Sequence, residues 1–466
     1  MSMLHAYHSK IPYRLVNGKP YITVSAKGIS NGLSDTFNDG ADFGPDTLLN
    51  ATAPNQYGPP YTQTVGIQEA MNYSATSPLF ASDPGHLFYP IRLLAGNFEF
   101  STPVTYGIGN HSPSDVFTID VSGSGIQTTV ISYTGTGNAI TIHPSIGEVA
   151  LRDFTINNPN TTANTMIYWD TTVTYNQLVV KGINNGQPTS SYLMYFNNVF
   201  DAIIKDVVTP TIYGIYINGT SNLPGFLYMH NQIWGGGTQT EIGQFVLADI
   251  SGLYQKLVVS NPVSVLKLSN FDGGNAGITF NAPVDTVLIE NGALGGNPSL
   301  IVNANVNYIK IMSCIVSGVL IGSTNTSQSY TVGVLSIDGL YNSYIHDTFS
   351  NASNVNISAY DFRNIPSGTY TSMPTQSTTN GTTAGTVSMD AVEFRAEYKK
   401  YVITFSGYEN DTTTNQVINF PIPFSSYAVI TGNNTGLTVS TTTTGITITS
   451  PNSTATFSGI VIVEGY

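Results

Sequence analysis

Short apolar runs, each ending in a polar turn residue, dominate the chain from about residue 149 onward. Runs of roughly four to eight β-branched and aromatic residues bounded by Asn, Gly and Ser are typical of β-strands. We expect strands at 149–158, 177–185, 202–208, 256–261, 265–270, 287–291, 308–312, 334–338 and 355–358. Helical patterning is scarce, and its best instance is 62–74, where Thr64 is placed to cap a short helix.

The apolar runs recur at a nearly constant spacing. One inward position in each run, at Leu268, Ile289, Ile311, Ile337 and Ile357, gives steps of 21, 22, 26 and 20 residues. A period in the low twenties with one strong strand per repeat suits a solenoid of stacked β coils. A β-sandwich also holds many short strands, but it gives no reason for this spacing to persist. We therefore predict a solenoid whose corners are filled by Asn, Gly, Ser and Thr.

Both ends of the chain depart from this repeat. The stretch 367–388 is rich in Thr, Ser and Gly and is typical of a linker or neck. Strands spaced by about ten residues then predict an antiparallel β-sandwich over 389–466. Near the N-terminus, Asn17-Gly18 between two short apolar runs predicts a β-hairpin over 13–24. The predicted organisation is an attachment segment at 1–36, a solenoid at 37–366, a linker at 367–388 and a sandwich at 389–466.

Composition and charge narrow the classes of function. Only 9% of the 466 residues are charged and the net charge is −13, against roughly 25% charged residues in average proteins. Without a Lys/Arg-rich run, no electrostatic footprint for nucleic acid or an anionic membrane is visible. No apolar run reaches the roughly 18 residues that span a bilayer, and residues 1–10 lack the pattern of a signal peptide. The single cysteine, Cys314, is expected to be a buried small hydrophobe.

Several segments resemble the entry to a right-handed parallel β-helix of the pectate-lyase-like superfamily. They are the Asp/Gly-rich turn at 38–47, the Gly-Ile-Gln-Glu-Ala-Met-Asn segment at 66–72, the strand at 91–100 and the Gly-Ser-Gly-Ile-Gln-Thr-Thr-Val-Ile turn at 123–131. The resemblance implies an all-β fold in which a short N-terminal helix caps the open end of the solenoid. The insertion at 48–61 departs from the family pattern.

The C-terminal segments 398–410, 418–424 and 460–466 resemble the small β-sandwiches at the ends of viral tail fibres. A β-helix followed by such a sandwich resembles the layout of a virion tailspike. This resemblance implies a homotrimer at the virion surface that is assembled in the host cell, attached to tail or capsid through its N-terminal segment, and bound to a host glycan or glycoprotein. It implies no cofactor, no nucleic acid and no membrane insertion. A non-viral cell-surface adhesin is an alternative, for which a secretion signal is expected.

A glycoside hydrolase or lyase of the same shape is the enzymatic alternative. Hydrolysis requires two carboxylates about 5 to 5.5 Å or roughly 6.5 to 9.5 Å apart. The candidates are Asp170, Asp201, Asp206 and Glu241, but no local pair singles one out. The Asp-Asp, Gly-His-Gly and Arg-Ile-Lys motifs of polygalacturonases are missing. A calcium-assisted lyase needs several acidic ligands and a base, for which Arg152 is the one arginine of the repeat region. The scattered histidines predict no metal site.

Binding is therefore favoured over catalysis. Trp169 and Trp234 are candidates for stacking against a sugar ring, and Trp234 precedes three glycines in what we expect to be an exposed corner. The sandwich loops at 410–414 and 431–436 offer a second candidate contact surface. Sequons for N-glycosylation, whose number is close to chance, occur at Asn50, Asn72, Asn110, Asn160, Asn218, Asn325, Asn351, Asn356, Asn380, Asn410, Asn433 and Asn452.

Overall fold

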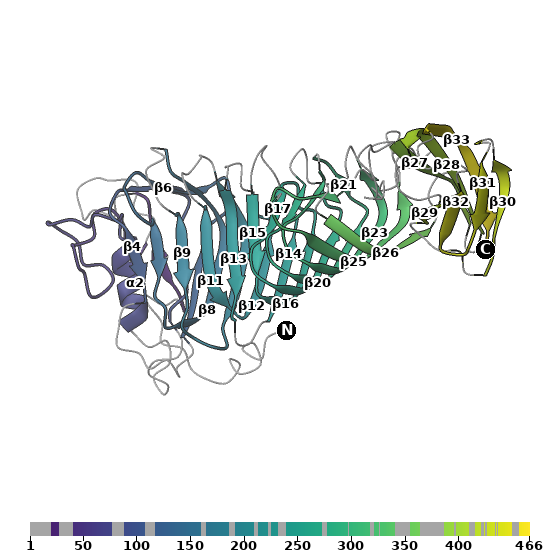
Figure 1. The fold of residues 1–466 in the computed structure, drawn as a ribbon. Helices are drawn as coiled ribbons and strands as arrows, with labels where there is room; N and C mark the ends of the chain where they lie inside the picture. The colour runs from purple at the N-terminus through teal and green to yellow at the C-terminus, as the bar shows by residue number, and fades with distance from the viewer. Residues whose placement is uncertain are drawn as a thin grey trace. The chain divides into compact units, whose positions relative to one another are not determined.

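A computed structural model gives the fold of the chain (Figure 1). It describes residues 20–27, 41–76, 88–107, 117–159, 165–185, 192–208, 213–221, 225–231, 239–272, 277–296, 298–316, 321–325, 327–340, 355–363, 386–395, 398–409, 415–420, 424, 426–433, 435, 437–449 and 456–466. The chain divides into two compact units, Met1–Val263 and Ser264–Tyr466. Each unit is described by itself.

The first unit is a parallel β-helix built from two sheets. Sheet 1 has the order β1 (Ile22–Val24), β2 (Ile91–Leu93), β5 (Phe117–Ser122), β8 (Ile146–Asn157), β10 (Gln177–Asn185), β12 (Asp201–Lys205), β14 (Phe226–His230) and β16 (Phe245–Ser251). Sheet 2 has the order β4 (Val104–Tyr106), β7 (Ile140–Ile142), β9 (Ile167–Asp170), β11 (Met194–Val199), β13 (Tyr213–Gly219), β15 (Gln239–Gly243) and β17 (Lys256–Val259). Two further strands, β3 (Gly96–Phe100) and β6 (Thr129–Tyr133), pair with each other, and β6 also pairs with β8.

From β7 onward the chain alternates between the two sheets, so each coil contributes one strand to each of them. Neighbouring strands are parallel and in register, as in β9–β11 and β10–β12. Because successive side chains of a strand point to opposite faces, one set points into the coil and the other outward. In β9 the inward residues Ile167 and Trp169 are fully buried, whereas Tyr168 and Asp170 are partly exposed.

Asn, Asp and Gly residues turn the chain at the corners. Asp206 and Asn231 directly follow strands of sheet 1 and both have a φ of 55°, and Asp153, at a bend within β8, has a φ of 61°. This left-handed region disfavours most side chains with a Cβ atom but tolerates Asn and Asp. The corners therefore explain why so many of the apolar runs end in Asn or Gly.

A short helix closes the first coil. The helix α2 (Ile67–Thr76) is capped as expected, because the Gln68 backbone N–H donates to Thr64 Oγ1 at 3.1 Å. The Gln68 side chain donates to Thr105 O and accepts from Thr105 N, both at 2.7 Å. Strand β4 is the first strand of sheet 2 and has no neighbouring strand on one side. The Gln68 side-chain amide pairs with the backbone N–H and C=O of Thr105 on that open edge.

Part of the predicted hairpin belongs to the coil itself. Residues Ile22–Val24 form β1, which pairs in parallel with β2 and so opens sheet 1. The first half of the predicted hairpin lies outside the described residues. The Thr23 backbone N–H and hydroxyl both donate to Asp42 Oδ2 at 2.8 Å, so the turn at 41–43 covers the free edge of β1.

The second unit contains further parallel coils. One sheet has the order β18 (Val263–Ser269), β20 (Val284–Glu290), β23 (Val306–Val316), β25 (Tyr330–Leu340) and β26 (Val355–Arg363), with β21 (Ala293–Leu294) on β23. The other has the order β19 (Ile278–Phe280), β22 (Leu300–Val302) and β24 (Ile321–Gly322).

The predicted column of inward residues is confirmed through Ile289, Ile311 and Ile337, which are paired in register. The last predicted member is wrong. Ile337 pairs with Phe362, whereas Ile357 pairs with Val332. The mismatch arises because β26 extends to Arg363, well past the short apolar run from which the spacing was measured.

The C-terminal part of the second unit is antiparallel. A four-stranded sheet has the order β27 (Thr386–Arg395), β28 (Tyr398–Glu409), β33 (Thr456–Gly465) and β30 (Ala428–Asn433), and a three-stranded sheet has the order β29 (Asn415–Asn419), β32 (Gly445–Thr449) and β31 (Thr438–Thr441). Tyr401 and Phe420 stack with ring centroids 5.0 Å apart inside this region. The expected run of short strands is present, and β27 begins at Thr386, within the expected linker. The domain boundaries expected from the sequence, at 36/37, 366/367 and 388/389, remain predictions.

The predicted fold class is confirmed as all-β, with a parallel β-helix, one short helix near its start and C-terminal antiparallel sheets. Cys314 is buried, and burial raises the pKa of its thiol, as expected of a small core residue. Among the described residues, no helix is long and apolar enough to cross a membrane.

The corner conformation leads to a stability prediction at Asn291, an exposed residue with a φ of 53°. Asn291→Ala is expected to lower the free energy of unfolding by about 1 kcal/mol, because alanine tolerates left-handed backbone poorly. Asn291→Gly is the matched control and should leave it nearly unchanged. Thermal midpoints measured at one scan rate test this, and equal losses in both variants would contradict it.

Candidate functional site

The four carboxylates proposed from the sequence lie on both sheets of the first unit. Asp170 ends β9 and Glu241 lies in β15, both on sheet 2, whereas Asp201 begins β12 and Asp206 follows it, both on sheet 1. Asp201 Oδ1 accepts from the Phe226 backbone N–H at 3.1 Å, and Asp206 Oδ1 accepts from Asn231 Nδ2 at 3.1 Å. The two acids on sheet 1 are therefore engaged in contacts that hold neighbouring rungs and corners.

On each sheet, the two candidate acids lie too far apart to form a catalytic pair for glycoside hydrolysis. Asp170 and Glu241 are three rungs apart, which at about 4.8 Å per rung is about 14 Å along the coil. The five residue steps along β12 separate Asp201 from the corner at Asp206 by about 16 Å. Neither separation falls in the window of about 5 to 9.5 Å that a pair of catalytic carboxylates needs.

The outer face of sheet 2 carries a tyrosine column instead. Tyr168, Tyr195 and Tyr216 occupy matching positions in β9, β11 and β13. Their rings stack with centroids 5.1 Å apart and nearly parallel for the first pair, and 4.5 Å apart for the second. Since each ring covers the face of its neighbour, the column presents ring edges and hydroxyl groups to its surroundings.

An amide column runs beside the tyrosines. Asn197 Nδ2 donates to Asp170 Oδ1 at 3.1 Å, Asn218 Nδ2 donates to Asn197 Oδ1 at 3.0 Å, and Asn261 Nδ2 donates to Asn218 Oδ1 at 3.1 Å. Gly243 occupies the rung between Asn218 and Asn261, where a Cβ atom would lie 2.4 Å from Asn261 Cβ. The glycine therefore gives Asn261 the room to reach across and continue the column.

Carboxylates mark the two ends of this surface. Asp170 Oδ1 also accepts from Asn198 Nδ2 at 2.8 Å. At the other end, Glu241 pairs in register with Tyr216 and accepts a hydrogen bond from the Tyr192 hydroxyl. We call the group comprising Tyr168, Tyr195, Tyr216, Asp170, Asn197, Asn218, Asn261 and Glu241 the sheet 2 ladder.

Burial and the nearby carboxylates together raise the pKa values of the three stacked tyrosines. Burial raises the pKa of Tyr168 and of Tyr195, and the negative charge of Asp170 adds to the effect on both. Burial, then Tyr195 and Glu241, raises the pKa of Tyr216 to about 12. All three hydroxyls thus keep their protons at neutral pH, and they are already hydrogen-bonded, Tyr168 to Asp170 and Tyr195 and Tyr216 to each other.

The ladder has the chemistry to bind neutral polar groups. Phenol hydroxyls, amides and carboxylates supply donors and acceptors at a fixed spacing on a rigid surface. Sugars present alternating hydroxyl groups that match such a surface, and each neutral hydrogen bond contributes roughly 0.5 to 1.5 kcal/mol. Repetition along the coil would let a chain of sugars make several such bonds at once.

Trp169, one of the two tryptophans proposed for glycan stacking, points the other way. It is fully buried inside the coil, because strand alternation sends Tyr168 and Asp170 outward and Trp169 inward. Trp169 is therefore a core residue, which corrects its assignment as a contact from outside. Trp234 lies outside the described residues.

The tyrosine column could have been found from the sequence. Each tyrosine sits between two apolar residues, as in Ile167-Tyr168-Trp169 and Met194-Tyr195-Phe196, and the three are 27 and 21 residues apart. These steps match the coil period, so the pattern places one tyrosine per rung on the outer face. Acids and tryptophans, chosen by residue type, do not include these positions.

The sequons divide between described and other residues. Asn50, Asn72, Asn218, Asn325, Asn356 and Asn433 belong to the described residues; Asn110, Asn160, Asn351, Asn380, Asn410 and Asn452 do not. Asn218 is buried within the ladder, and its amide donates to Asn197 and Gln244, so it is not open to a glycan.

No group of three or more His, Cys, Asp or Glu residues suited to a metal ion occurs among the residues that the structure describes.

The raised tyrosine pKa values predict a loss of stability at alkaline pH. A phenol is charged when deprotonated, and its folded pKa of about 12 at Tyr216 exceeds the unfolded value of 10.0. The contribution of the Tyr216 phenol to the free energy of unfolding is thus complete below pH 10 and is lost as the pH rises through about 12. Tyr216→Phe should shift the alkaline unfolding midpoint to higher pH, measured by circular dichroism. Tyr61→Phe, at an exposed site, is the control, and an equal shift there would refute the assignment to the ladder.

The comparison with solved structures gives a weak likeness. No protein-family model and no curated protein matches the chain. Among solved structures, the tailspike protein of Acinetobacter phage vB_ApiP_P1 is similar over 81% of this chain and 80% of that chain, with 10% sequence identity and a TM-score of 0.21. The assignment of a parallel β-helix rests on the strand registers of this chain itself.

Proposed function

We propose that this chain is a virion tailspike or surface fibre that attaches a virus to a glycan or glycoprotein on its host cell. The observation that carries the proposal is the sheet 2 ladder, a column of tyrosine hydroxyls beside a column of amides on the outside of a rigid coil. Hydroxyl, amide and aromatic groups are the adaptable contacts that binding surfaces favour.

The coil suits attachment because it is a stiff scaffold. Each rung hydrogen-bonds only to its neighbours, so a solenoid extends in one direction and presents a long surface. Few charges on that surface make contacts less sensitive to ionic strength, since hydrogen bonds between neutral groups are not screened by salt. In this proposal the N-terminal segment 1–36 joins the particle, and the protein resides at the virion surface.

We further propose that the protein is a homotrimer held in part by its C-terminal antiparallel sheets. Val429 in β30 and Ile460 in β33 are 50% and 37% exposed, although both lie in strands. Together with Tyr427, also 50% exposed, they leave apolar surface that association would remove from water. Closed symmetry is the usual outcome for such self-association.

The attachment proposal predicts that binding to host cells depends on the tyrosine hydroxyls of the sheet 2 ladder. The double variant Tyr195→Phe/Tyr216→Phe keeps the ring stack and removes two hydroxyls, so it should bind susceptible host cells several-fold more weakly. The control Tyr61→Phe removes an exposed hydroxyl from the same unit and should bind normally. Cell-binding titrations with fluorescently labelled protein measure the difference. Undiminished binding by the double variant would remove the ladder from the attachment site.

The homotrimer proposal is tested by measuring the molecular mass of the protein in solution. Light scattering after size exclusion should give three times the mass of one chain for the unmodified protein. Val429→Asp/Ile460→Asp should shift the mass toward that of one chain, because two charges at a buried contact are costly. Ser440→Asp, at an exposed position of β31 in the three-stranded sheet, is the control. A stable monomer in the unmodified protein would overturn the proposal.

A further inference from the structure

Four tyrosine rings form a continuous run on the outside of the first unit. Tyr168, Tyr195 and Tyr216 stack in that order, and the ring of Tyr192, just before β11, lies 5.6 Å from that of Tyr216 between centroids. All four side chains are half-buried, so their neighbours hold them in place and they still reach solvent. Because each ring contacts the next, an electron removed from one of them can be replaced by its neighbour.

Tyr195 and Tyr216 are the closest pair of this run. Their ring centroids are 4.5 Å apart and their planes differ by 4°. The register of β11 with β13 places the two residues opposite each other, one rung apart. Their hydroxyl groups also share a hydrogen bond. The phenol ends of the two rings are therefore held together, and the ring carbons next to the two oxygen atoms lie close to each other.

A carboxylate accepts a hydrogen bond at each end of the run. The Tyr168 hydroxyl is hydrogen-bonded to Asp170, and the Tyr192 hydroxyl donates to Glu241. A phenol that loses an electron also releases its proton, and a base within hydrogen-bond reach takes that proton up. The run therefore combines stacked rings with proton acceptors, an arrangement that favours one-electron oxidation of tyrosine.

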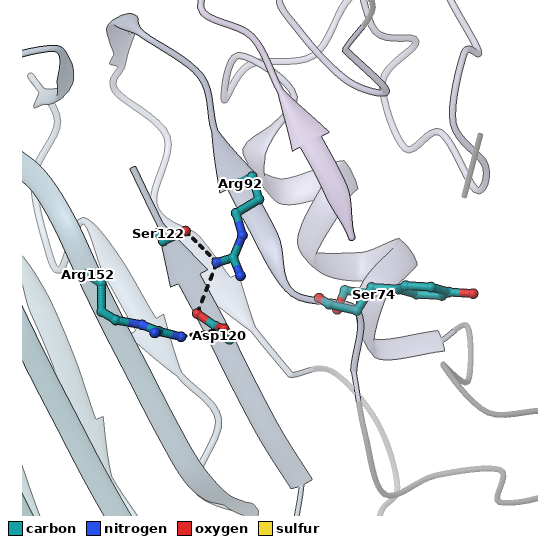
Figure 2. Close-up of polar contacts among 6 residues, drawn as sticks. Ser74, Arg92, Asp120, Ser122 and Arg152 are labelled. Carbon is teal, nitrogen blue, oxygen red and sulfur yellow. Dashed lines mark hydrogen bonds and ion pairs between the residues drawn. The ribbon is translucent and has the colours of Figure 1, made fainter. Parts of the chain in front are cut away.

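Tyr106 shows what these four residues have and a core tyrosine lacks. It is fully buried, and its hydroxyl lies 2.9 Å from Oγ of Ser74 in the helix α2. The carboxylate whose charge acts on it, that of Asp120, already accepts from Arg92 Nη1 at 3.3 Å and from Arg152 Nη2 at 2.6 Å (Figure 2). Tyr106 is thus closed to an oxidant, and two guanidinium groups occupy its nearby carboxylate.

We propose that Tyr195 and Tyr216 are a dityrosine cross-linking site, at which a haem peroxidase with hydrogen peroxide joins β11 to β13 through their rings. Each phenol gives up one electron and its hydroxyl proton. Hydrogen peroxide takes up both electrons and both protons as its O–O bond breaks, which yields two molecules of water. The two phenoxyl radicals then form a carbon–carbon bond between the ring carbons next to their oxygen atoms. The hydrogen on each of these carbons moves to the oxygen and restores both phenols.

The cross-link would act as a covalent staple between two rungs. The chain has a single cysteine, Cys314, so no disulfide can form between two of its own residues. A bond between Tyr195 and Tyr216 closes a loop within the chain and restricts the unfolded state, as a disulfide does. The inference uses residues of the sheet 2 ladder but does not rest on what the ladder binds.

Two other tyrosine pairs in the described part of the chain provide a comparison. Tyr73 and Tyr89 have centroids 6.1 Å apart, and Tyr89 is buried. Tyr427 and Tyr466 have centroids 5.5 Å apart with planes tilted by 49°, and both are exposed. Both pairs are wider than Tyr195 and Tyr216. The second pair is open to the same oxidant, so it separates the effect of close stacking from that of exposure.

The test treats the full chain with peroxidase and hydrogen peroxide at low protein concentration. Dityrosine fluorescence should appear, and peptide mapping by mass spectrometry should find the peptides of Tyr195 and Tyr216 joined, two hydrogen atoms lighter than their sum. Tyr195→Phe and Tyr216→Phe should each lose this product, because phenylalanine keeps the ring but forms no phenoxyl radical. Tyr427→Phe is the matched control and should keep it. The cross-linked chain should also unfold at a higher temperature than the untreated chain.

Four outcomes would overturn the proposal. One is the absence of the joined peptides under conditions that cross-link a short tyrosine peptide. Another is a product that joins separate chains, seen as a doubled mass on a denaturing gel. A third is a main product at Tyr427 and Tyr466, which would make exposure decisive, and the last is an unchanged unfolding temperature in the cross-linked chain. These readouts involve no host cell, so failure here is distinguishable from failure of the attachment proposal.

Discussion

Parallel pairing in register is the constraint on which this molecule depends. Each strand satisfies its backbone groups only by aligning with the strand one coil earlier, so residues more than 20 positions apart in sequence are stacked at about 4.8 Å. Any side chain that recurs with the coil period becomes a column. Inside the coil these columns are apolar, as Ile289, Ile311 and Ile337 show, and their burial drives folding. Outside, the same geometry creates the stacked tyrosines and the linked asparagines.

At the ends of the coil, the outermost strands have no strand to pair with on one side. Side chains of the N-terminal region take that place. Gln68 supplies both a donor and an acceptor to Thr105 of β4, and Asp42 accepts from the backbone and hydroxyl of Thr23 in β1. A bare edge would invite pairing with another chain. The turn at 41–43 and the helix thus close the N-terminal end of the solenoid.

The sequence was sufficient for the fold class and for most strand positions, because burial on one face imposes a visible alternation and period. It was insufficient for register. Ile357 had the expected spacing but pairs with Val332, since the length of a corner is invisible in the apolar pattern. The same limit affected the candidate site. Trp169 was judged by residue type, whereas its inward direction follows from its place between Tyr168 and Asp170. Asp170 and Glu241 belong to one surface, but only the strand order shows that three rungs separate them.

Register also changes what the scarcity of charge means. Averaged over the chain, −13 net charge and 9% charged residues argue against any polyanionic partner. At physiological ionic strength, however, exposed charges are screened beyond about 8 Å, so a ligand responds to the column beside it and hardly to the remainder of the chain. Lys181 and Lys205 are one rung apart on the outer face of sheet 1, and the acids Asp201 and Asp249 lie on the same face. A solenoid can therefore gather its few charged side chains into columns on the outer faces of its sheets, an arrangement that its overall composition does not show.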